Sequence, residues 1–252
     1  MSRNYLRFLV LSMLSVLALV VAACGGDDKS SSPSSSKSSG GATTNAAEAP
    51  AKKGGTFNML AASDVDFVDP GHTYYTWGMV FTFATNRPLY SFKPDDGANP
   101  VPDLAEAEPE VSADKKTVTV KIRKGVKYAP PVNREVTSKD VKYAMERFFS
   151  VNVGGQYPGY FQPIVGSPAK PTKGVKPISG IETPDDQTIV FKLKEPVGVS
   201  FAAALVMPIT VPVPEEYAKP FDAKNPSTYN THVAFTGPYM IKNNSSGSLT
   251  GY

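Results

Sequence analysis

Residues 112–147 read SADKKTVTVKIRKGVKYAPPVNREVTSKDVKYAMER, and this stretch decides the fold. It opens with a polar turn at Ser112–Lys116. In Val118–Ile122 apolar and polar residues then alternate, as they do in a half-buried β-strand. Arg123-Lys124-Gly125 predicts a second turn, in which the glycine takes a positive φ. The stretch therefore predicts a short strand held between two turns.

A helix is expected at the end of the same stretch. Thr137-Ser138-Lys139-Asp140 is typical of a helix start, with a polar cap and a carboxylate in the first turn, where it favours the helix dipole. Four apolar residues then follow at positions i, i+3, i+4 and i+7, namely Val141, Ala144, Met145 and Phe148. This spacing places them on one face, so we expect an amphipathic helix that packs by that face.

A similar sequence pattern occurs further along the chain. Asp114–Ile122 and Asp186–Leu193 share an acidic turn residue, a threonine and an alternating strand. The similarity is too short for a solenoid repeat. It predicts two hairpin strands built by the same turn chemistry.

Several shorter elements are expected around these. Thr56–Leu60 alternates and predicts a first strand, Asp69-Pro70-Gly71 predicts a turn, Tyr75–Phe83 has helical spacing, and Leu89–Phe92 predicts a short extended piece. Thirteen of the 23 prolines lie between residues 158 and 238. Because proline interrupts both helices and strands, we expect short elements and few long helices.

The N-terminus has the pattern of an export signal. Arg3 and Arg7 precede an apolar run from Phe8 to Ala23. The 16 residues of this run are fewer than the roughly 20 that span a bilayer, which argues against an uncleaved membrane helix. Cys24, the only cysteine, follows small residues and precedes Gly25-Gly26. This resembles the lipobox of bacterial lipoproteins, and it implies a signal peptide at residues 1–23 and a lipid on Cys24 rather than a buried thiol.

Residues 24–53 are expected to be a disordered tether. They are rich in Ser, Gly, Ala, Lys and Pro, and they cannot bury enough apolar surface to offset the entropy lost on ordering. Their root-mean-square reach is roughly 30 Å. With Cys24 used for the anchor, no disulfide can form within the chain, so residues 54–252 depend on a buried core for stability.

Composition argues against several classes of function. Removal of residues 1–23 removes two arginines and no acidic residue, which lowers the formal net charge from +3 to +1. A nucleic-acid partner is not expected from such a balance. Only His72 and His232 are present, and Ser63-Asp64 near His72 is the only local trio with the residue types of a hydrolase. We therefore expect no enzyme, no metal site and no cofactor.

Five stretches, taken in order, resemble the bacterial extracellular solute-binding proteins of family 5. These are the oligopeptide-, dipeptide- and nickel-binding receptors of ABC importers. Each stretch alone is weak, but five in the same order behind a lipobox and a tether are specific. They are Gly54–Phe57 with Val68-Asp69-Pro70, Val101–Glu106, Ser112–Tyr128, Thr137–Arg147 and Thr236–Tyr239.

The resemblance implies an α/β fold. We expect the N-terminal lobe of a periplasmic-binding-protein-like (type II) domain over residues 54–252, with a mixed sheet, short strands and few helices. Family members are usually about twice as long and have two lobes, so the lobe is expected to be incomplete and truncated before the second lobe. The loop Ala129–Glu135 departs from the family pattern, which often has a "DG" turn there, so that loop gives no guide to the ligand.

The resemblance also implies where a ligand is bound. The stretch Ala62–Asp66 matches the loop after the first strand, which faces the cleft in relatives, and it gives the candidates Ser63, Asp64 and Val65. Aromatic side chains suit peptides, which adds Tyr74, Tyr75 and Trp77. For Trp77 core packing in a helix is the favoured alternative, whereas Tyr74 and Tyr75 could equally pack or bind. Tyr160 and Phe161 could lie near the cleft or under a loop.

The expected function is that of the substrate-binding lipoprotein of an ABC importer for peptides or another small solute. It would capture ligand without covalent chemistry, beside its permease subunits at the extracytoplasmic face of a bacterial membrane. The fragment alone is expected to bind poorly because one wall of the cleft is missing. Two alternatives remain, namely a lipid-anchored surface interaction protein and a non-functional truncated receptor.

Overall fold

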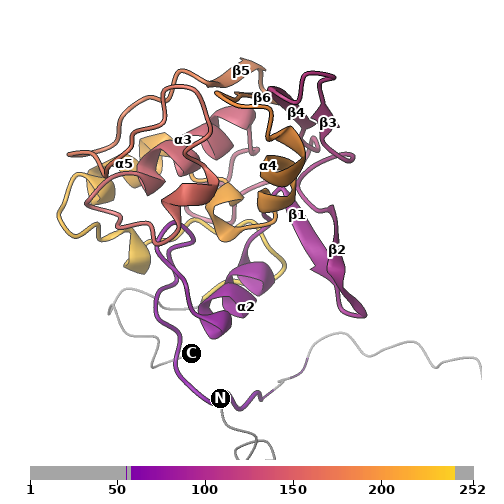
Figure 1. Ribbon diagram of the computed structural model, residues 1–252. Coiled ribbons are helices and arrows are strands. Elements are labelled where there is room, and N and C mark those ends of the chain that lie inside the picture. The colour runs from indigo at the N-terminus through magenta and orange to yellow at the C-terminus, as the bar shows by residue number, and fades with distance from the viewer. Residues whose placement is uncertain (1–54, 56–57, 242–252) are drawn as a thin grey trace, which may run out of the picture. The chain divides into compact units, whose positions relative to one another are not determined.

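The computed structural model describes residue 55 and residues 58–241, and its main sheet has four strands in the order β3-β4-β6-β5 (Figure 1). All pairs in this sheet are antiparallel. The strands are β3 (Glu110–Val111), β4 (Thr117–Lys121), β5 (Ile181–Asp185) and β6 (Thr188–Lys192). The predicted signal peptide, Cys24 and the predicted tether lie outside the described residues.

The two segments with similar sequence, Asp114–Ile122 and Asp186–Leu193, supply the two central strands of this sheet, β4 and β6. β4 and β6 each belong to a hairpin, as predicted. They also pair with each other, with Val118 opposite Phe191 and Val120 opposite Ile189. These four apolar side chains are buried. The alternation in sequence therefore places one apolar face of the sheet against the core.

Helix α3 (Ser138–Phe148) packs against β5 and β6, and α4 (Gly198–Ala204) packs against β3 and β4 (Figure 1). The predicted start of α3 is confirmed as a capping box, in which the Thr137 N–H donates to Asp140 Oδ2 at 2.8 Å. The predicted apolar face is buried as well. Gly125, in the turn after β4, has the expected positive φ of 79°.

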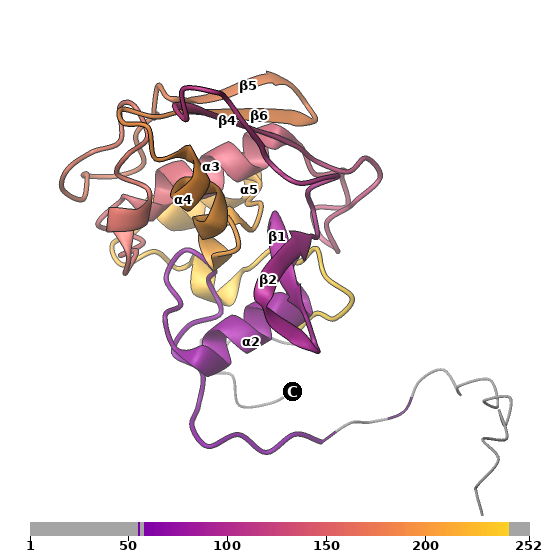
Figure 2. The same cartoon turned by 45° about the vertical axis from the view of Figure 1, so that its right-hand side comes forward.

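The remaining elements are short, as the prolines predict. They include α2 (Thr76–Thr85), the hairpin β1 (Tyr90–Lys93) and β2 (Asp96–Pro102), and α5 (Glu215–Asp222). Three single-turn 3₁₀ helices cover Pro158–Tyr160, Pro208–Thr210 and Tyr229–Thr231. Figure 2 shows the β1–β2 hairpin as a ribbon separate from the four-stranded sheet.

Two clusters of buried apolar side chains form the core. The larger lies under the four-stranded sheet, and the smaller joins the N-terminal segment to α3 and α5. Leu104, from the family-like stretch Val101–Glu106, is fully buried in the larger cluster. The smaller cluster contains Val68, Tyr143, Ala144, Val213, Ala218, Tyr229, Val233, Phe235 and Ile241.

A buried ion cluster holds the smaller core together. Arg147, on α3, makes two bidentate pairs, one with Asp69 at 2.7 and 2.8 Å and one with Asp222 at 2.6 and 2.7 Å. The Tyr143 hydroxyl also donates to Asp222, and the guanidinium carbon lies 4.6 Å from the centre of the Tyr229 ring. Burial alone lowers the pKa of Arg147, but the two carboxylates raise it well above its ordinary value. Asp69 and Arg147 belong to two of the five family-like stretches, so these stretches meet to fix the fold.

The structure differs from expectation in two respects. The sheets are not mixed, because every pairing between the named strands is antiparallel, and a parallel bridge joins only Ser150 and Thr172 within the described residues. The predicted first strand is absent over Asn58–Leu60, where Leu60 is 98% exposed, and Thr56 and Phe57 lie outside the description. Among residues 58–241 no segment pairs with Asn58–Leu60, and a strand needs a partner.

None of the helices in the described part of the chain is long and apolar enough to cross a membrane.

Candidate functional site

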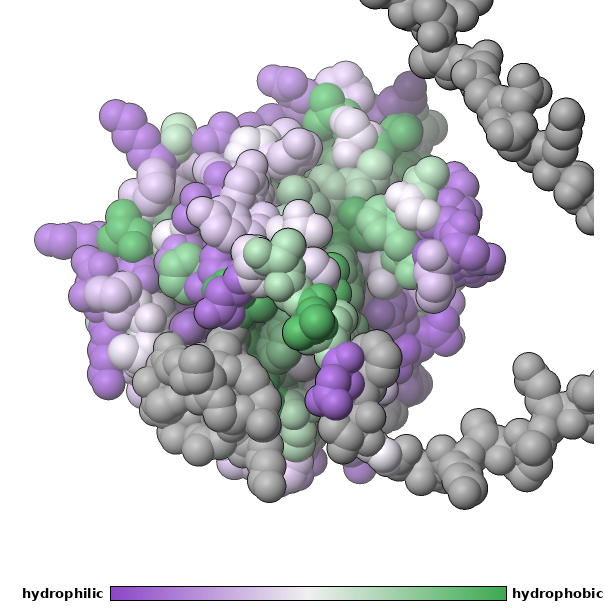
Figure 3. Space-filling model, turned by 90° about the horizontal axis from the view of Figure 1, so that it is seen from below, coloured by the Kyte–Doolittle hydropathy of each residue, from purple (hydrophilic) through white to green (hydrophobic). Residues whose placement is uncertain are grey.

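An open hollow of about 570 Å³ lies at the N-terminal end of α2. Its lining contains no charged side chain and consists of Ser63, Tyr74, Tyr75, Thr76, Trp77 and Met79. Tyr74 and Tyr75 are 56% and 60% exposed. Figure 3 shows the face of the molecule that carries α2, where apolar side chains gather in a band bordered by hydrophilic ones. Large aromatic rings that remain in solvent are typical of a binding surface.

Asp66 positions the two tyrosines. Its carboxylate accepts the N–H groups of Tyr74 and Tyr75 at 2.6 and 2.9 Å and the Thr73 hydroxyl at 2.7 Å. Burial raises the pKa of Asp66, but these hydrogen bonds outweigh burial, so its pKa lies below the ordinary value. The loop before α2 is therefore tied to an ionised carboxylate.

The close approach of Asp66 to α2 depends on Gly78. A Cβ at this position would overlap Thr73 Oγ1 and Asp66 Oδ1. Glycine is thus required by packing, since the helix itself would favour alanine. Gly78 lets the loop and the helix share one compact anchor beneath the exposed rings.

The structure brings together four of the predicted ligand-binding residues. Ser63, Tyr74, Tyr75 and Trp77 line the one hollow, and Trp77 is half-buried rather than part of the core. Asp64 and Val65 lie beside this group but outside the lining, and Asp64 accepts the Val65 N–H at 2.8 Å. Whether any of these residues binds a ligand remains a prediction.

The two other aromatic candidates have different environments. Phe161 is fully buried in the larger core, under the loop, while Tyr160 is exposed. Tyr160 lines a second, shallow hollow of about 330 Å³ together with Tyr157.

Sequence reasoning placed Asp66 in the cleft-facing stretch without its anchoring role, and it missed Tyr157 as part of this region. The Tyr157 ring lies 6.2 Å from the Tyr74 ring, and its buried hydroxyl has no hydrogen-bond partner. Burial raises the pKa of Tyr157, and the charges of Asp66 and Asp69 raise it further, so the phenol stays protonated. No local pattern marks these roles, because Asp66 precedes α2 by ten residues and Tyr157 lies in another segment of the chain.

The hydrolase-like trio does not assemble. The His72 ring stacks on Phe67 with 3.5 Å between ring centres, while the Asp64 carboxylate accepts a hydrogen bond from the Val65 N–H. Within the described residues, no three His, Cys, Asp or Glu side chains are placed to hold a metal ion. The hollow offers aromatic faces and hydroxyl groups, which suit non-covalent binding of uncharged parts of a ligand.

Comparison with known proteins places these observations in a family. The sequence profile of the bacterial extracellular solute-binding proteins, family 5 Middle, matches residues 99–250. No curated protein sequence matches the chain.

Solved structures agree with the profile. "Clavulanic acid biosynthesis oligopeptide binding protein 2" is 33% identical with a TM-score of 0.61, covering 72% of this chain and 32% of its own. An oligopeptide ABC transporter substrate-binding domain from Bacillus anthracis str. Ames is 25% identical with a TM-score of 0.60, covering 74% and 35%. Listeria monocytogenes OppA bound to peptide is 24% identical with a TM-score of 0.58, covering 71% and 34%, which supports the fold alone.

The chain spans about a third of the length of these structures. The expected α/β fold of a partial binding-protein lobe, with short strands and few helices, is confirmed by them. The profile covers more than half of the chain, and four of the five family-like stretches lie entirely within it. The chain therefore belongs to the bacterial extracellular solute-binding proteins of family 5.

Proposed function

We propose that this chain is the N-terminal part of a receptor that captures peptides for an ABC importer. Family membership supports a solute-binding role rather than an enzymatic one, and similar solved structures are described as oligopeptide-binding proteins. The observation that carries the proposal is the hollow at α2, where Tyr74 and Tyr75 are held by Asp66 yet stay in solvent.

The hollow would supply one wall of the binding site. Helix α2 is apolar on most sides, but its buried residues are the small ones, Gly78, Thr82 and Thr85, and larger side chains such as Trp77 remain half-exposed. A helix that is apolar all round is normally covered. The relatives are more than twice as long, and the rest of their fold would supply the opposing wall.

The lining indicates which part of a peptide this wall takes. With two tyrosines, a tryptophan and a methionine and no charged group, it suits an aromatic or aliphatic side chain. The charged termini of a peptide would need partners outside this hollow, because burial of an unpaired charge is costly.

The membrane attachment in this proposal rests on the sequence. A lipid on Cys24, followed by the tether of residues 25–53, would hold the lobe near permease subunits at the extracytoplasmic face. Replacement Cys24→Ser is expected to abolish incorporation of labelled palmitate and to release the protein from the membrane fraction. Retention of the label by the variant would contradict the anchor and leave the binding role untouched.

Peptide binding is best tested in a chimera that restores a complete fold. The chain would be joined to the part of clavulanic acid biosynthesis oligopeptide binding protein 2 that lies beyond their shared region, and titrated calorimetrically with a mixed pool of apolar peptides. We expect the chimera to bind and the chain alone to bind weakly. The pair of changes Tyr74→Ala and Tyr75→Ala should lower affinity by about tenfold or more, since each lost aromatic contact contributes about 0.5–1.5 kcal/mol.

Val199→Ala is a matched control. Val199 is 63% exposed on α4 and does not line the hollow. Equal binding by the chimera with and without Tyr74 and Tyr75 would contradict the role of this wall. Micromolar binding by the chain alone would contradict the need for a second wall.

A further inference from the structure

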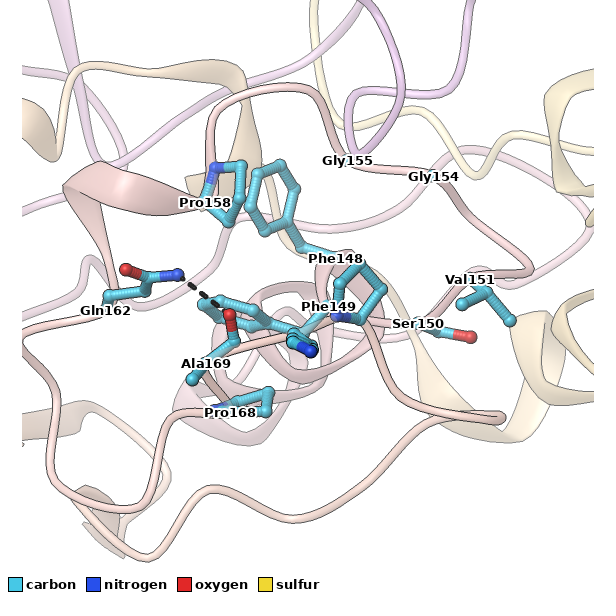
Figure 4. A pocket seen from close by; sticks show the side chains of 12 residues that line it. Phe148, Phe149, Ser150, Val151, Gly154, Gly155, Pro158, Gln162, Pro168 and Ala169 are labelled. Carbon is cyan, nitrogen blue, oxygen red and sulfur yellow. Dashed lines mark hydrogen bonds between the residues drawn. The ribbon is translucent and has the colours of Figure 1, made fainter.

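A further cavity, of about 270 Å³, lies where the C-terminal end of α3 meets the loop of residues 150–171 (Figure 4). In the close-up, Phe148 and Pro158 lie on one side, Pro168 and Ala169 lie on the other, and the Phe149 ring lies between them. The cavity shares no residue with the hollow at Tyr74 and Tyr75. It is therefore a separate feature from the proposed peptide wall.

The chemistry of the lining is apolar. The lining includes the rings of Phe148 and Phe149 and the prolines Pro158, Pro168 and Pro171. The only charged side chain in the lining is that of Lys170, which is exposed at the rim. A charged ligand would find no buried partner among these residues, whereas an uncharged ring would find aromatic and proline faces.

The cavity is built on a fixed frame. The Phe149 carbonyl accepts the Thr172 N–H at 2.8 Å, and the Val151 N–H donates to the Thr172 carbonyl at 2.9 Å. On the opposite side, the Ser167 hydroxyl donates to the Gln162 carbonyl at 2.6 Å, and Lys194 Nζ donates to the same oxygen at 2.9 Å. These bonds hold both sides of the loop, so the space between them is preformed.

Gly155 keeps the Phe148 ring in place. A Cβ at residue 155 would overlap two carbons of that ring, so glycine allows the loop to lie directly on it. The ring is also fixed by an edge contact with Phe149, with 5.5 Å between ring centres. Because Phe148 cannot swing into the space without moving this packing, the cavity does not close on itself.

The volume sets the size of the occupant. A dry apolar cavity of about 150 Å³ in another protein binds benzene. A space of about 270 Å³ therefore suits a single ring or a fused pair of rings. Entry is available past Ala169 and Lys170, both of which are exposed, where the Gln162 amide makes only a long contact of 3.4 Å to the Ala169 carbonyl (Figure 4).

We propose that this cavity binds an uncharged aromatic compound between benzene and indole in size, independently of any peptide at α2. The test uses the full chain in lipid nanodiscs with an uncharged, photoreactive benzyl alcohol that carries a diazirine. Crosslinked residues are mapped by mass spectrometry of peptides, with and without excess indole. Labelling is expected within residues 148–171, and indole should suppress it several-fold.

Two variants sharpen the test. Ala169→Phe places a ring at the mouth and should lower labelling of residues 148–171 several-fold, while Ala203→Phe, at an exposed position of α4 outside the lining, should leave it unchanged. Absence of label from residues 148–171, or label there that neither indole nor Ala169→Phe reduces, would overturn the proposal. If circular dichroism shows that Ala169→Phe does not fold, the indole competition in the unaltered chain decides the matter.

Discussion

The ion cluster around Arg147 and the hollow at Tyr74 and Tyr75 each depend on an aspartate from the same short segment, but their side chains lie in opposite environments. Asp69 and Asp66 are only three residues apart. Asp69 is buried and pairs with Arg147, whereas Asp66 lies under two rings that remain in solvent. Buried charges that have all their partners hold the fold together. Aromatic rings that stay exposed above a fixed anchor are available to contact a ligand.

The largest expected effect comes from breaking the ion cluster. Arg147→Met removes the guanidinium and leaves Asp69 and Asp222 buried without their partner. Loss of one member of a buried pair costs about 3–5 kcal/mol, and we expect the free energy of unfolding to fall by that amount. Urea denaturation followed by far-ultraviolet circular dichroism measures it.

An exposed ion pair provides the control for that change. Lys139 and Asp186 lie 3.2 Å apart on the surface, and Lys139→Met should lower the free energy of unfolding by less than about 1 kcal/mol. If Arg147→Met costs no more than Lys139→Met, the buried cluster is not what fixes this part of the fold.

A smaller effect is expected from Gly78→Ala, which tests the anchor beneath the rings. Alanine favours a helix by about 1 kcal/mol over glycine, but overpacking against Asp66 and Thr73 costs about 1–3 kcal/mol, so we expect net destabilisation. Fluorescence of Trp77, the only tryptophan, should change with it because Trp77 is on the same helix.

Gly159→Ala is the matched control for that prediction. A Cβ at Gly159 would meet no atom within 4 Å, so this change should leave both stability and the Trp77 fluorescence nearly unaltered. A Gly78→Ala protein more stable than the original would mean that Asp66 does not need its close approach to α2.

The elements of this fold could be predicted where the information is local. The capping residues and apolar spacing of Ser138–Phe148 lie within one helix, and the alternation of Val118–Ile122 lies within one strand. The Thr56–Leu60 pattern has the same alternation, but alternation does not show whether another strand lies beside the segment to pair with it. Over Asn58–Leu60 no strand forms.

The candidate site and the ion cluster also differ in whether local sequence could predict them. Ser63 could be proposed from its place in a loop that faces the cleft in similar proteins, and Tyr74, Tyr75 and Trp77 could be proposed from their aromatic side chains. Asp222 could not be paired with Arg147 from sequence, because 75 residues separate them and no pattern around Asp222 marks it. Contacts between distant segments are decided by packing of the whole core.

A pH titration distinguishes the Asp66 anchor from the rest of the molecule. The pKa of Asp66 in the folded chain lies below its ordinary value of 3.8, because hydrogen bonds from Tyr74, Tyr75 and Thr73 outweigh the opposing effect of burial. The unfolded chain therefore binds more protons as pH falls through that value. The stabilisation by Asp66 is complete above it and is lost as pH falls toward the folded pKa.

The measurement compares the original chain with Asp66→Asn. The difference between their free energies of unfolding should be constant near neutral pH and shrink below about pH 4. Because both proteins keep the Arg147 cluster, its own response to acid cancels in the difference. A difference that does not change with pH would mean that the carboxylate charge of Asp66 does not stabilise the loop.

The smallest effect on stability is expected at the exposed rings themselves. Tyr75 is 60% exposed, and its side chain lines the hollow, so Tyr75→Ser should change the free energy of unfolding by no more than about 0.5 kcal/mol. In the peptide-binding chimera the same change should weaken binding several-fold, because the lost ring would have faced the ligand. A residue that matters for binding and not for folding is the opposite of Arg147, which does not line the hollow and whose replacement should act on stability. If Tyr75→Ser instead lowers stability by more than about 1 kcal/mol and leaves peptide affinity unchanged, then Tyr75 belongs with the core, and the contrast between the two regions fails.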